Sequence, residues 1–239
     1  MFTGIWFEGK HSYKDLGLTI SERKIGYPSK IKIQERVPYS NIVYDFSNIY
    51  GGQEYEPRPL SYTFNVAYKD KAINYYLYET EISNWLMSPN SKVVLKDDLI
   101  PGYYFLAEIV NNPSSDFKFV GGSLSVEFTA YPFKIKELEE GNDIWDEFNF
   151  LLDYAQTTQY NVQDSIDVTL YNPGAIPLSP LISSTSSMQI IKNGITYNIP
   201  VGESTSYDFI LDIGENKLRI IGNGSISFHF RLELIWCTK

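Results

Sequence analysis

The sequence predicts a mainly β protein with two domains, of which the first carries a helix and the second is a β-sandwich. Alternation of apolar and polar residues with a period of two recurs along the chain, which is typical of half-buried antiparallel strands. Short turn signals separate these segments in the second half. An acidic, glycine-containing stretch at residues 136–142 separates two halves of different character. We therefore expect domains at 1–138 and 139–239, each large enough to bury a core.

Three segments of the first half have strand patterns. Tyr62, Phe64 and Val66 alternate with polar or small residues, and so do Leu124, Val126 and Phe128 in the segment 123–129. The segment 103–110 is more continuously apolar, as expected of a central strand. The sequence Asn-Asn-Pro-Ser-Ser-Asp at 111–116 predicts a hairpin loop after it.

Two segments have the spacing of amphipathic helices. In 70–87, Tyr78, Ile82 and Trp85 fall on one face, Asp70 is a candidate N-cap, and Pro89 follows the end. In 143–155, apolar residues form a wide stripe, and acidic residues in the first turns suit the positive end of the helix dipole.

The pattern of the second half predicts a series of short strands. Asn193-Gly194 between two apolar segments predicts a type I′ hairpin over 188–199. A second hairpin is predicted over 209–221, with its turn at residues 214–216. The segments 166–170 and 226–234 complete the predicted strands, each with one apolar face.

Composition and charge exclude several classes of function. The chain has 239 residues, with 20 Lys and Arg against 29 Asp and Glu, so its net charge is −9. A nucleic-acid binder that relies on phosphate neutralisation needs clustered basic residues. The single cysteine, Cys237, excludes an internal disulfide framework and a cysteine-rich zinc site. We expect no metal, no cofactor, no signal peptide and no helix that inserts into a membrane.

Aromatic residues are unusually frequent, with 19 Tyr, 14 Phe and 4 Trp. Tyrosine suits protein interfaces, because it is stiff and has a polar tip on an apolar body. The candidate interface is a Tyr-rich hairpin with its tip at Gly51-Gly52, comprising Tyr44, Phe46, Tyr50 and Tyr55. Ordinary core residues of a local hairpin are the alternative interpretation.

No catalytic set stands out. His11, Ser12 and Asp15 contain the residue types of a triad, but they lie within five residues, and a polar turn explains them better. His229 lies on the polar face of the last strand. The acidic residues Glu137, Glu139, Glu140, Asp143, Asp146 and Glu147 offer paired carboxylates for a glycosidase, although a solvated face explains them more simply. We expect the protein not to be an enzyme.

Tryptophan can also stack on sugars. Trp85 and Trp145 lie on apolar helix faces, so we expect both in the core. Trp6 and Trp236 are the candidates for glycan stacking.

Several segments together resemble the distal tail proteins (Dit) of siphophages. Residues 7–18 resemble the opening of that family, in which a short strand leads into an S-x-x-D-x-G-L turn. The other similar segments are 37–46 and 56–64 in the first half and 170–174, 214–218 and 227–231 in the second. The similarity covers nearly the whole chain, in order.

This resemblance implies a fold and a function. It implies an N-terminal β-sandwich domain with one helix that forms a hexameric ring, and a C-terminal galectin-like or carbohydrate-module-like β-sandwich. The implied function is a baseplate hub in the virion, at the tail tip, made in the host cytoplasm. The implied partners are five further copies, the tail tube protein and a tail-associated, fibre or receptor-binding protein.

In such a ring, DNA would pass through the lumen without specific binding. Six copies at −9 each would carry −54, and a lumen of that sign would not hold phosphate. The alternative function, from another class, is a carbohydrate-binding module that recognises host cell-wall polysaccharide.

Overall fold

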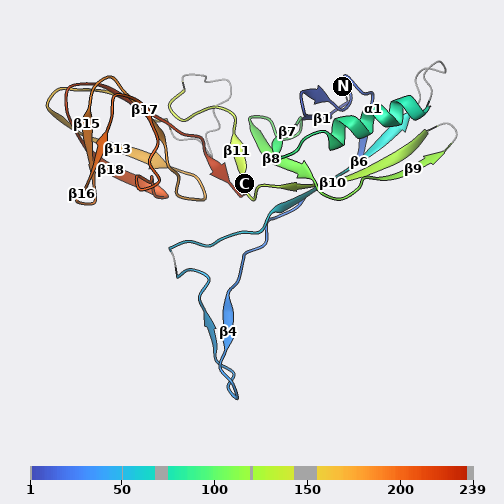
Figure 1. Ribbon diagram of the computed structural model, residues 1–239, viewed down its shortest axis with the longest axis horizontal. Coiled ribbons are helices and arrows are strands. Elements are labelled where there is room, and N and C mark those ends of the chain that lie inside the picture. The colour runs from blue at the N-terminus through green and yellow to red at the C-terminus, as the bar shows by residue number, and fades with distance from the viewer. Residues whose placement is uncertain (1, 50, 68–74, 119–120, 143–154, 236–239) are drawn as a thin grey trace. The chain divides into compact units, whose positions relative to one another are not determined.

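The computed structural model describes residues 2–49, 51–67, 75–118, 121–142 and 155–235. The chain divides into two compact units, Met1–Lys134 and Ile135–Lys239. Strands dominate both units, and α1 (Tyr75–Met87) is the one α-helix of the described residues, so the mainly β fold class is confirmed (Figure 1).

The first unit is built on an antiparallel sheet. Its strands are β1 (Ile5–Phe7), β2 (Lys10–His11), β3 (Thr19–Ile25), β6 (Arg58–Ala67), β7 (Val93–Asp97), β8 (Tyr103–Ile109), β9 (Ser114–Lys118) and β10 (Gly121–Ala130). They follow the order β2-β1-β7-β8-β10-β6-β3, and β9 also pairs with β10. The loop predicted over 111–116 is therefore too long, because its last residues join a strand.

The core of the first unit lies between this sheet and α1. The predicted alternation is confirmed in β6 and β10, where Tyr62 lies opposite Val126 and Phe64 opposite Leu124, all buried. Trp85 of α1 is buried as predicted and donates from Nε1 to the carbonyl of Phe7 over 2.6 Å. The beginning predicted for this helix, at Asp70, lies outside the described residues.

One buried charge of the first unit has compensating partners. Asp97 accepts a hydrogen bond from the Tyr62 hydroxyl over 3.0 Å, and Arg23 Nε lies 2.7 Å from the same carboxylate oxygen. Burial, and then the nearby Asp97 carboxylate, raise the pKa of Tyr62 well above its usual 10.0. Its hydroxyl therefore remains a donor to Asp97 at neutral pH.

The second unit is a β-sandwich in its described residues. Its strands are β12 (Gln159–Val162), β13 (Ser165–Asn172), β14 (Leu181–Ser184), β15 (Met188–Lys192), β16 (Ile195–Ile199), β17 (Gly202–Ser204), β18 (Gly214–Ile221), β19 (Gly224–His229) and β20 (Glu233–Leu234). One sheet has the order β12-β19-β14-β17 and the other β13-β18-β15-β16. Inward residues of both sheets, including Leu170, Ile190, Leu218 and Phe228, form one buried cluster. A short strand, β11 (Lys134–Lys136), spans the junction and pairs with β20.

The hairpin predicted at Asn193-Gly194 is confirmed, and both residues have the positive φ angles that a type I′ turn requires. The second predicted hairpin, over 209–221, is wrong. Residues 214–216 belong to β18, which pairs with β13 and β15 instead of folding back on residues 209–213. The Asn216 side chain exchanges two hydrogen bonds of 2.8 Å with the backbone of Asp212, which fixes the bend before the strand. The predicted helix over 143–155, including Trp145, lies outside the described residues except for its last residue.

The acidic stretch is not a solvated linker throughout. Glu140 is buried and accepts from Lys136 Nζ over 3.2 Å and from Gln156 Nε2 over 3.2 Å. Gln156 in turn exchanges hydrogen bonds with the backbone of Tyr171 in β13. The segment 135–140 is thereby part of the second unit, whereas the predicted boundary between 138 and 139 falls inside this segment.

Candidate interaction surface

A long excursion connects β3 to β6 in the first unit, and we call residues 27–57 the extended hairpin. Its ladder consists of β4 (Gln34–Arg36) and β5 (Val43–Asp45), with Glu35 opposite Tyr44. The turn between the strands is closed by the N–H of Val37, which donates to the carbonyl of Ile42 over 3.1 Å. The tip is therefore at residues 38–41, and the tip predicted at Gly51-Gly52 is wrong (Figure 1).

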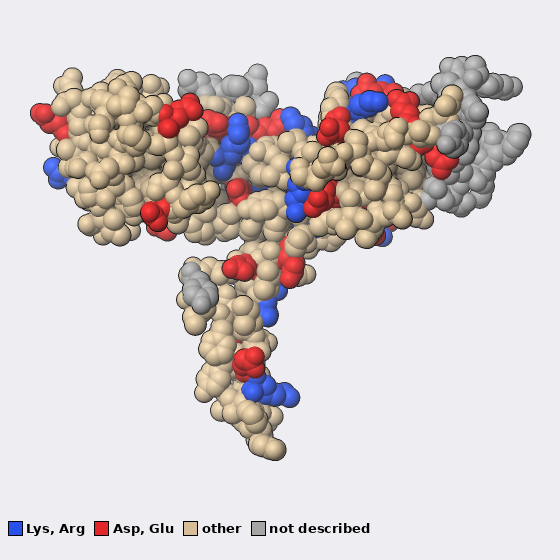
Figure 2. Space-filling view, in the orientation of Figure 1, with Lys and Arg blue, Asp and Glu red and all other residues tan. Residues whose placement is uncertain are grey.

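Apolar side chains on this hairpin face solvent. Among the described residues from 29 to 57, none is buried. Tyr39 at the tip is fully exposed, and Ile42 and Tyr44 are 55% and 56% exposed. Residues 37–44 carry no charge, and Figure 2 shows the end of the hairpin without Lys, Arg, Asp or Glu. Such a concentration of exposed apolar groups marks an interaction site.

Asp45 fixes the geometry of the strands. Its carboxylate accepts from the Ser47 N–H over 3.0 Å, from Lys32 Nζ over 3.0 Å and from Gln34 Nε2 over 3.2 Å. Hydrogen bonds from Ser47, followed by those from Lys32 and Gln34, hold the pKa of this carboxyl well below its usual 3.8. The carboxylate therefore stays ionised and keeps its partners across the physiological pH range.

The base of the hairpin is joined to the sheet. The Gly26 N–H donates to the carbonyl of Pro59 over 2.9 Å, and the Tyr55 ring packs edge-on against Phe133 at 5.5 Å between centroids. Arg58 follows at the start of β6, fully buried, with its guanidinium 5.5 Å from the centre of the Phe105 ring. Burial lowers the pKa of Arg58 to about 10, so this group still carries its charge at neutral pH.

The four residues predicted as an interface differ in position and exposure. Tyr44 and Phe46 are exposed neighbours on the returning strand, with ring centroids 6.3 Å apart. Tyr55 lies at the base, partly covered, and Tyr50 lies outside the described residues. Sequence reasoning missed Tyr39 at the tip and Ile42 beside it, although the uncharged run 37–44 could have indicated them.

Of the two tryptophans predicted to stack on sugars, Trp6 is partly exposed and Trp236 lies outside the described residues. The Trp6 ring meets His11 edge-on at 4.9 Å, and Lys14 Nζ lies 5.2 Å from its centre. Part of the ring is therefore already in contact with the protein.

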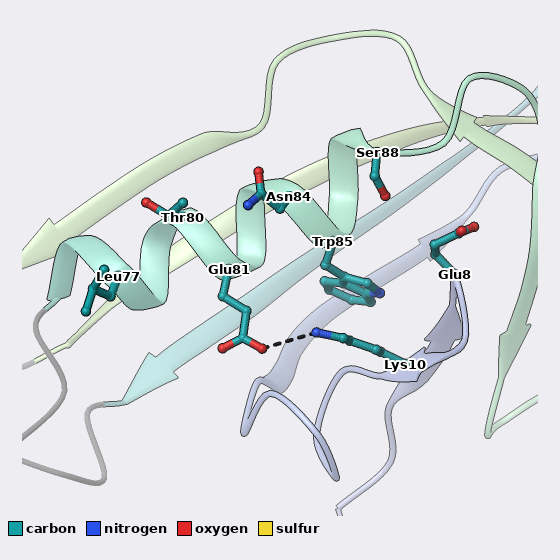
Figure 3. Close-up of a pocket in the computed structure, with 8 residues that line it drawn as sticks. All are labelled: Glu8, Lys10, Leu77, Thr80, Glu81, Asn84, Trp85 and Ser88. Carbon is teal, nitrogen blue, oxygen red and sulfur yellow. Dashed lines mark hydrogen bonds and ion pairs between the residues drawn. The ribbon is translucent and has the colours of Figure 1, made fainter.

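A shallow groove of about 480 Å³ lies beside α1 (Figure 3). Lys10 Nζ and the Glu81 carboxylate pair across it over 3.1 Å, and Trp85 lies beneath. Glu8 and three uncharged polar residues, Thr80, Asn84 and Ser88, complete most of its lining. The groove therefore combines one ion pair and several polar side chains with the indole of Trp85.

The short segment that holds His11, Ser12 and Asp15 forms the polar turn that was predicted for it in preference to a catalytic triad. His11 is fully buried, its Nδ1 accepts from the N–H groups of Tyr13 and Lys14, and its Nε2 lies 3.0 Å from Asp98 Oδ2. Both ring nitrogens therefore have partners, Nδ1 within the turn and Nε2 on Asp98, and Ser12 Oγ accepts from the Ile5 N–H over 3.0 Å. The arrangement stabilises the turn.

The acidic residues proposed for a glycosidase are separated by their partners. Glu140 is buried against Lys136, whereas Glu139 contacts His229 and Arg231 at 3.0 and 3.2 Å. Asp143, Asp146 and Glu147 lie outside the described residues. Within the described part of the chain, no group of three or more His, Cys, Asp or Glu side chains is placed to hold a metal ion, and no helix is long and apolar enough to cross a membrane.

The fold is similar to a solved structure. That structure is the SPP1 Dit (gp 19.1) protein, described as a paradigm of the hub adsorption apparatus in phages that infect Gram-positive bacteria. The TM-score is 0.68 at 10% sequence identity, and the similarity covers 97% of this chain and 100% of that one. No family model matches the sequence, and no curated protein matches it. The likeness shows a shared fold, and the neighbour is a structural hub protein.

Proposed function

We propose that this protein is a structural subunit of a phage tail hub, and that six copies close a ring at the distal end of a siphophage tail. The extended hairpin carries the proposal, because it is an exposed apolar element on a fold shared with a hub protein. Exposed apolar surface favours association in water, and in the ring a neighbouring copy would cover it.

The contact between copies is heterologous. The hairpin is a narrow two-stranded element, and in the proposed ring it would lie against a different surface of the next copy. A repeated contact of this kind closes into a ring when the rotation between copies divides a full turn. Tyr39 at the tip and Ile42 beside it, with Tyr44 and Phe46 behind them, would contribute exposed apolar area to this contact.

The ring would join the tail tube on one side and a tail-associated, fibre or receptor-binding protein on the other, and DNA would pass through its lumen. Its place is the virion tail tip. This architectural function requires no reaction, and the net charge of −9 per chain is consistent with a lumen that does not retain phosphate.

Negative-stain imaging of the purified chain tests the proposal. Wild type should form rings, and Tyr44→Ser with Phe46→Ser should abolish them while the monomer remains folded. The matched control is Tyr207→Ser with Ile213→Ser, which removes one exposed aromatic and one exposed aliphatic side chain from the second unit, at 91% and 56% exposure. Rings in the hairpin variant, or their absence from wild type, would contradict the proposal.

Glycan binding stays a second prediction, favoured by the partial exposure of Trp6, at 37%. Titration of the full chain with cell-wall polysaccharide should give saturable binding that Trp6→Ala removes. Binding unaffected by that substitution would exclude Trp6 as the stacking residue.

A further inference from the structure

A serine, a histidine and a glutamate lie in a chain of hydrogen bonds on the second unit, away from the extended hairpin. Ser227 Oγ lies 3.0 Å from Nε2 of His229, and Nδ1 of His229 lies 3.0 Å from Oε2 of Glu139. We propose that these residues form a hydrolytic triad that accepts esters of short carboxylic acids. A reaction at this site would be additional to the hub function and independent of ring formation.

The strand explains how the first two residues meet. Alternate residues of a strand point to the same face, so Ser227 and His229 of β19 both stand on the outer face of the sheet β12-β19-β14-β17. Their neighbours Ile226, Phe228 and Phe230 are buried on the other face. A triad is defined by geometry and roles, and a strand can present the pair without a sharp turn.

The carboxylate comes from a distant part of the sequence and is itself held in place. The Glu140 N–H donates to the carbonyl of Phe230 over 3.0 Å, which fixes the segment beside the end of β19. Arg231 Nη2 lies 3.2 Å from Oε1 of Glu139, while Oε2 faces His229. Glu139 and Arg231 are therefore positioning residues, and Ser227 and His229 are the catalytic residues.

The chemistry of the three groups sets the direction of each hydrogen bond. An ionised carboxylate only accepts, so Nδ1 of a neutral His229 carries the hydrogen and donates to Glu139. Nε2 then accepts the hydroxyl hydrogen of Ser227, as a general base must. The side chains of His229 and Glu139 are 42% and 38% exposed, so a substrate can reach the site from solvent.

The register of the sheet supplies further groups. Gln159 and Ser183 lie directly opposite Ser227 on the two neighbouring strands, and opposite residues share a face. The Gln159 amide and the Ser183 hydroxyl are donors for a developing oxyanion. Leu181, 37% exposed, lies opposite His229 and offers an apolar contact to a short acyl chain.

The reaction proceeds in two balanced steps. Ser227 Oγ attacks the ester carbonyl carbon while its proton moves to Nε2 of His229, and the bond to the leaving alcohol breaks as the alcohol takes that proton. Water then attacks the acyl-serine, gives a proton to His229, and releases the carboxylic acid as Ser227 recovers its proton.

The test uses the full chain with p-nitrophenyl acetate. We expect release of p-nitrophenol with turnover, and an intact mass raised by one acetyl group, located at Ser227 by peptide mapping. Ser227→Ala should remove the acetyl group and the turnover, and His229→Gln should slow acylation about 100-fold. Ser225→Ala is the matched control, because it removes another serine from the same strand and face, and it should behave as wild type.

Circular dichroism and thermal unfolding establish that each variant is folded. Glu139→Gln should lower kcat with little change in KM, because it alters the orientation of His229 and not the surface that contacts the ester. The proposal is overturned if wild type is not acetylated, if the acetyl group lies elsewhere, or if Ser227→Ala retains turnover through the imidazole of His229 alone.

Discussion

Replacement of Lys136 by methionine would remove the cation that faces the buried Glu140. The two side chains are 9% and 2% exposed, and Nζ lies 3.2 Å from Oε1. Loss of one partner leaves an uncompensated buried charge, which typically costs about 3–5 kcal/mol. Because Gln156 still donates to the other carboxylate oxygen, we expect about 3 kcal/mol, at the lower end of that range.

The chain contains a matched control for this substitution. Lys10 and Glu81 also form a lysine–glutamate pair, at 3.1 Å, but their side chains are 46% and 52% exposed. Exposed pairs contribute roughly 0–1 kcal/mol, so Lys10→Met should change the free energy of unfolding very little. The double variant Lys136→Met with Glu140→Leu should recover most of the lost stability, since it removes both charges.

Urea unfolding followed by far-ultraviolet circular dichroism measures these effects. For a unit of this size the slope is about 1–3 kcal/mol per molar urea, so Lys136→Met should lower the midpoint of the second unit's transition by roughly 1–3 M. The reasoning would be refuted if Lys136→Met and Lys10→Met had the same small effect, because burial would then not determine the strength of the pair.

Four further substitutions have definite expectations. Gly4→Ala would place a Cβ 2.4 Å from Cε1 of the fully buried His11, so we expect a loss of about 1–3 kcal/mol in urea unfolding, whereas Gly52→Ala, with open space around it, should be within about 0.5 kcal/mol of wild type. Gly194→Ala meets no atom within 4 Å but has a φ of +80°, so its cost should be the backbone strain alone, about 1 kcal/mol by the same measurement. Although partial burial raises the pKa of Asp98, hydrogen bonds from the Gly4 N–H and from His11 outweigh it and lower that pKa below 3.8. A lowered native pKa stabilises the fold above the unfolded-state pKa of about 3.9, and this contribution is lost as the pH falls through the native value. The stability advantage of wild type over Asp98→Asn at pH 7 should therefore shrink below about pH 4, and an advantage that grew on acidification would contradict the assignment.

The parts of the fold that sequence reasoning predicted correctly depend on local patterns. Alternation in β6 and β10 identified their buried faces, and Asn193-Gly194 identified a hairpin, because both signals act within a few residues. Residues 214–216 have the composition of a turn, yet they belong to β18 and pair with residues of β13 that are 42 to 46 positions away in sequence. Long-range pairing of this kind has no local signal.

The candidate sites, too, were predictable only where the signal is local in sequence. Tyr44 and Phe46 were predicted from aromatic content, but the position of the tip depends on the pairing of β4 with β5. The polar face that carries Ser227 and His229 is visible in the sequence, whereas Glu139, 90 residues from His229, joins them only through the fold. Glu140, its neighbour, belongs to the buried pair with Lys136, and nothing in an acidic run distinguishes the two residues.

Native mass spectrometry of the purified wild-type chain measures the number of copies in the assembly directly. A closed ring of six predicts a species of six times 27.5 kDa, about 165 kDa, which the hairpin variant Tyr44→Ser with Phe46→Ser converts to monomer. A chain that stays at 27.5 kDa at every concentration, or an assembly of any other fixed number of copies, would contradict a six-membered hub.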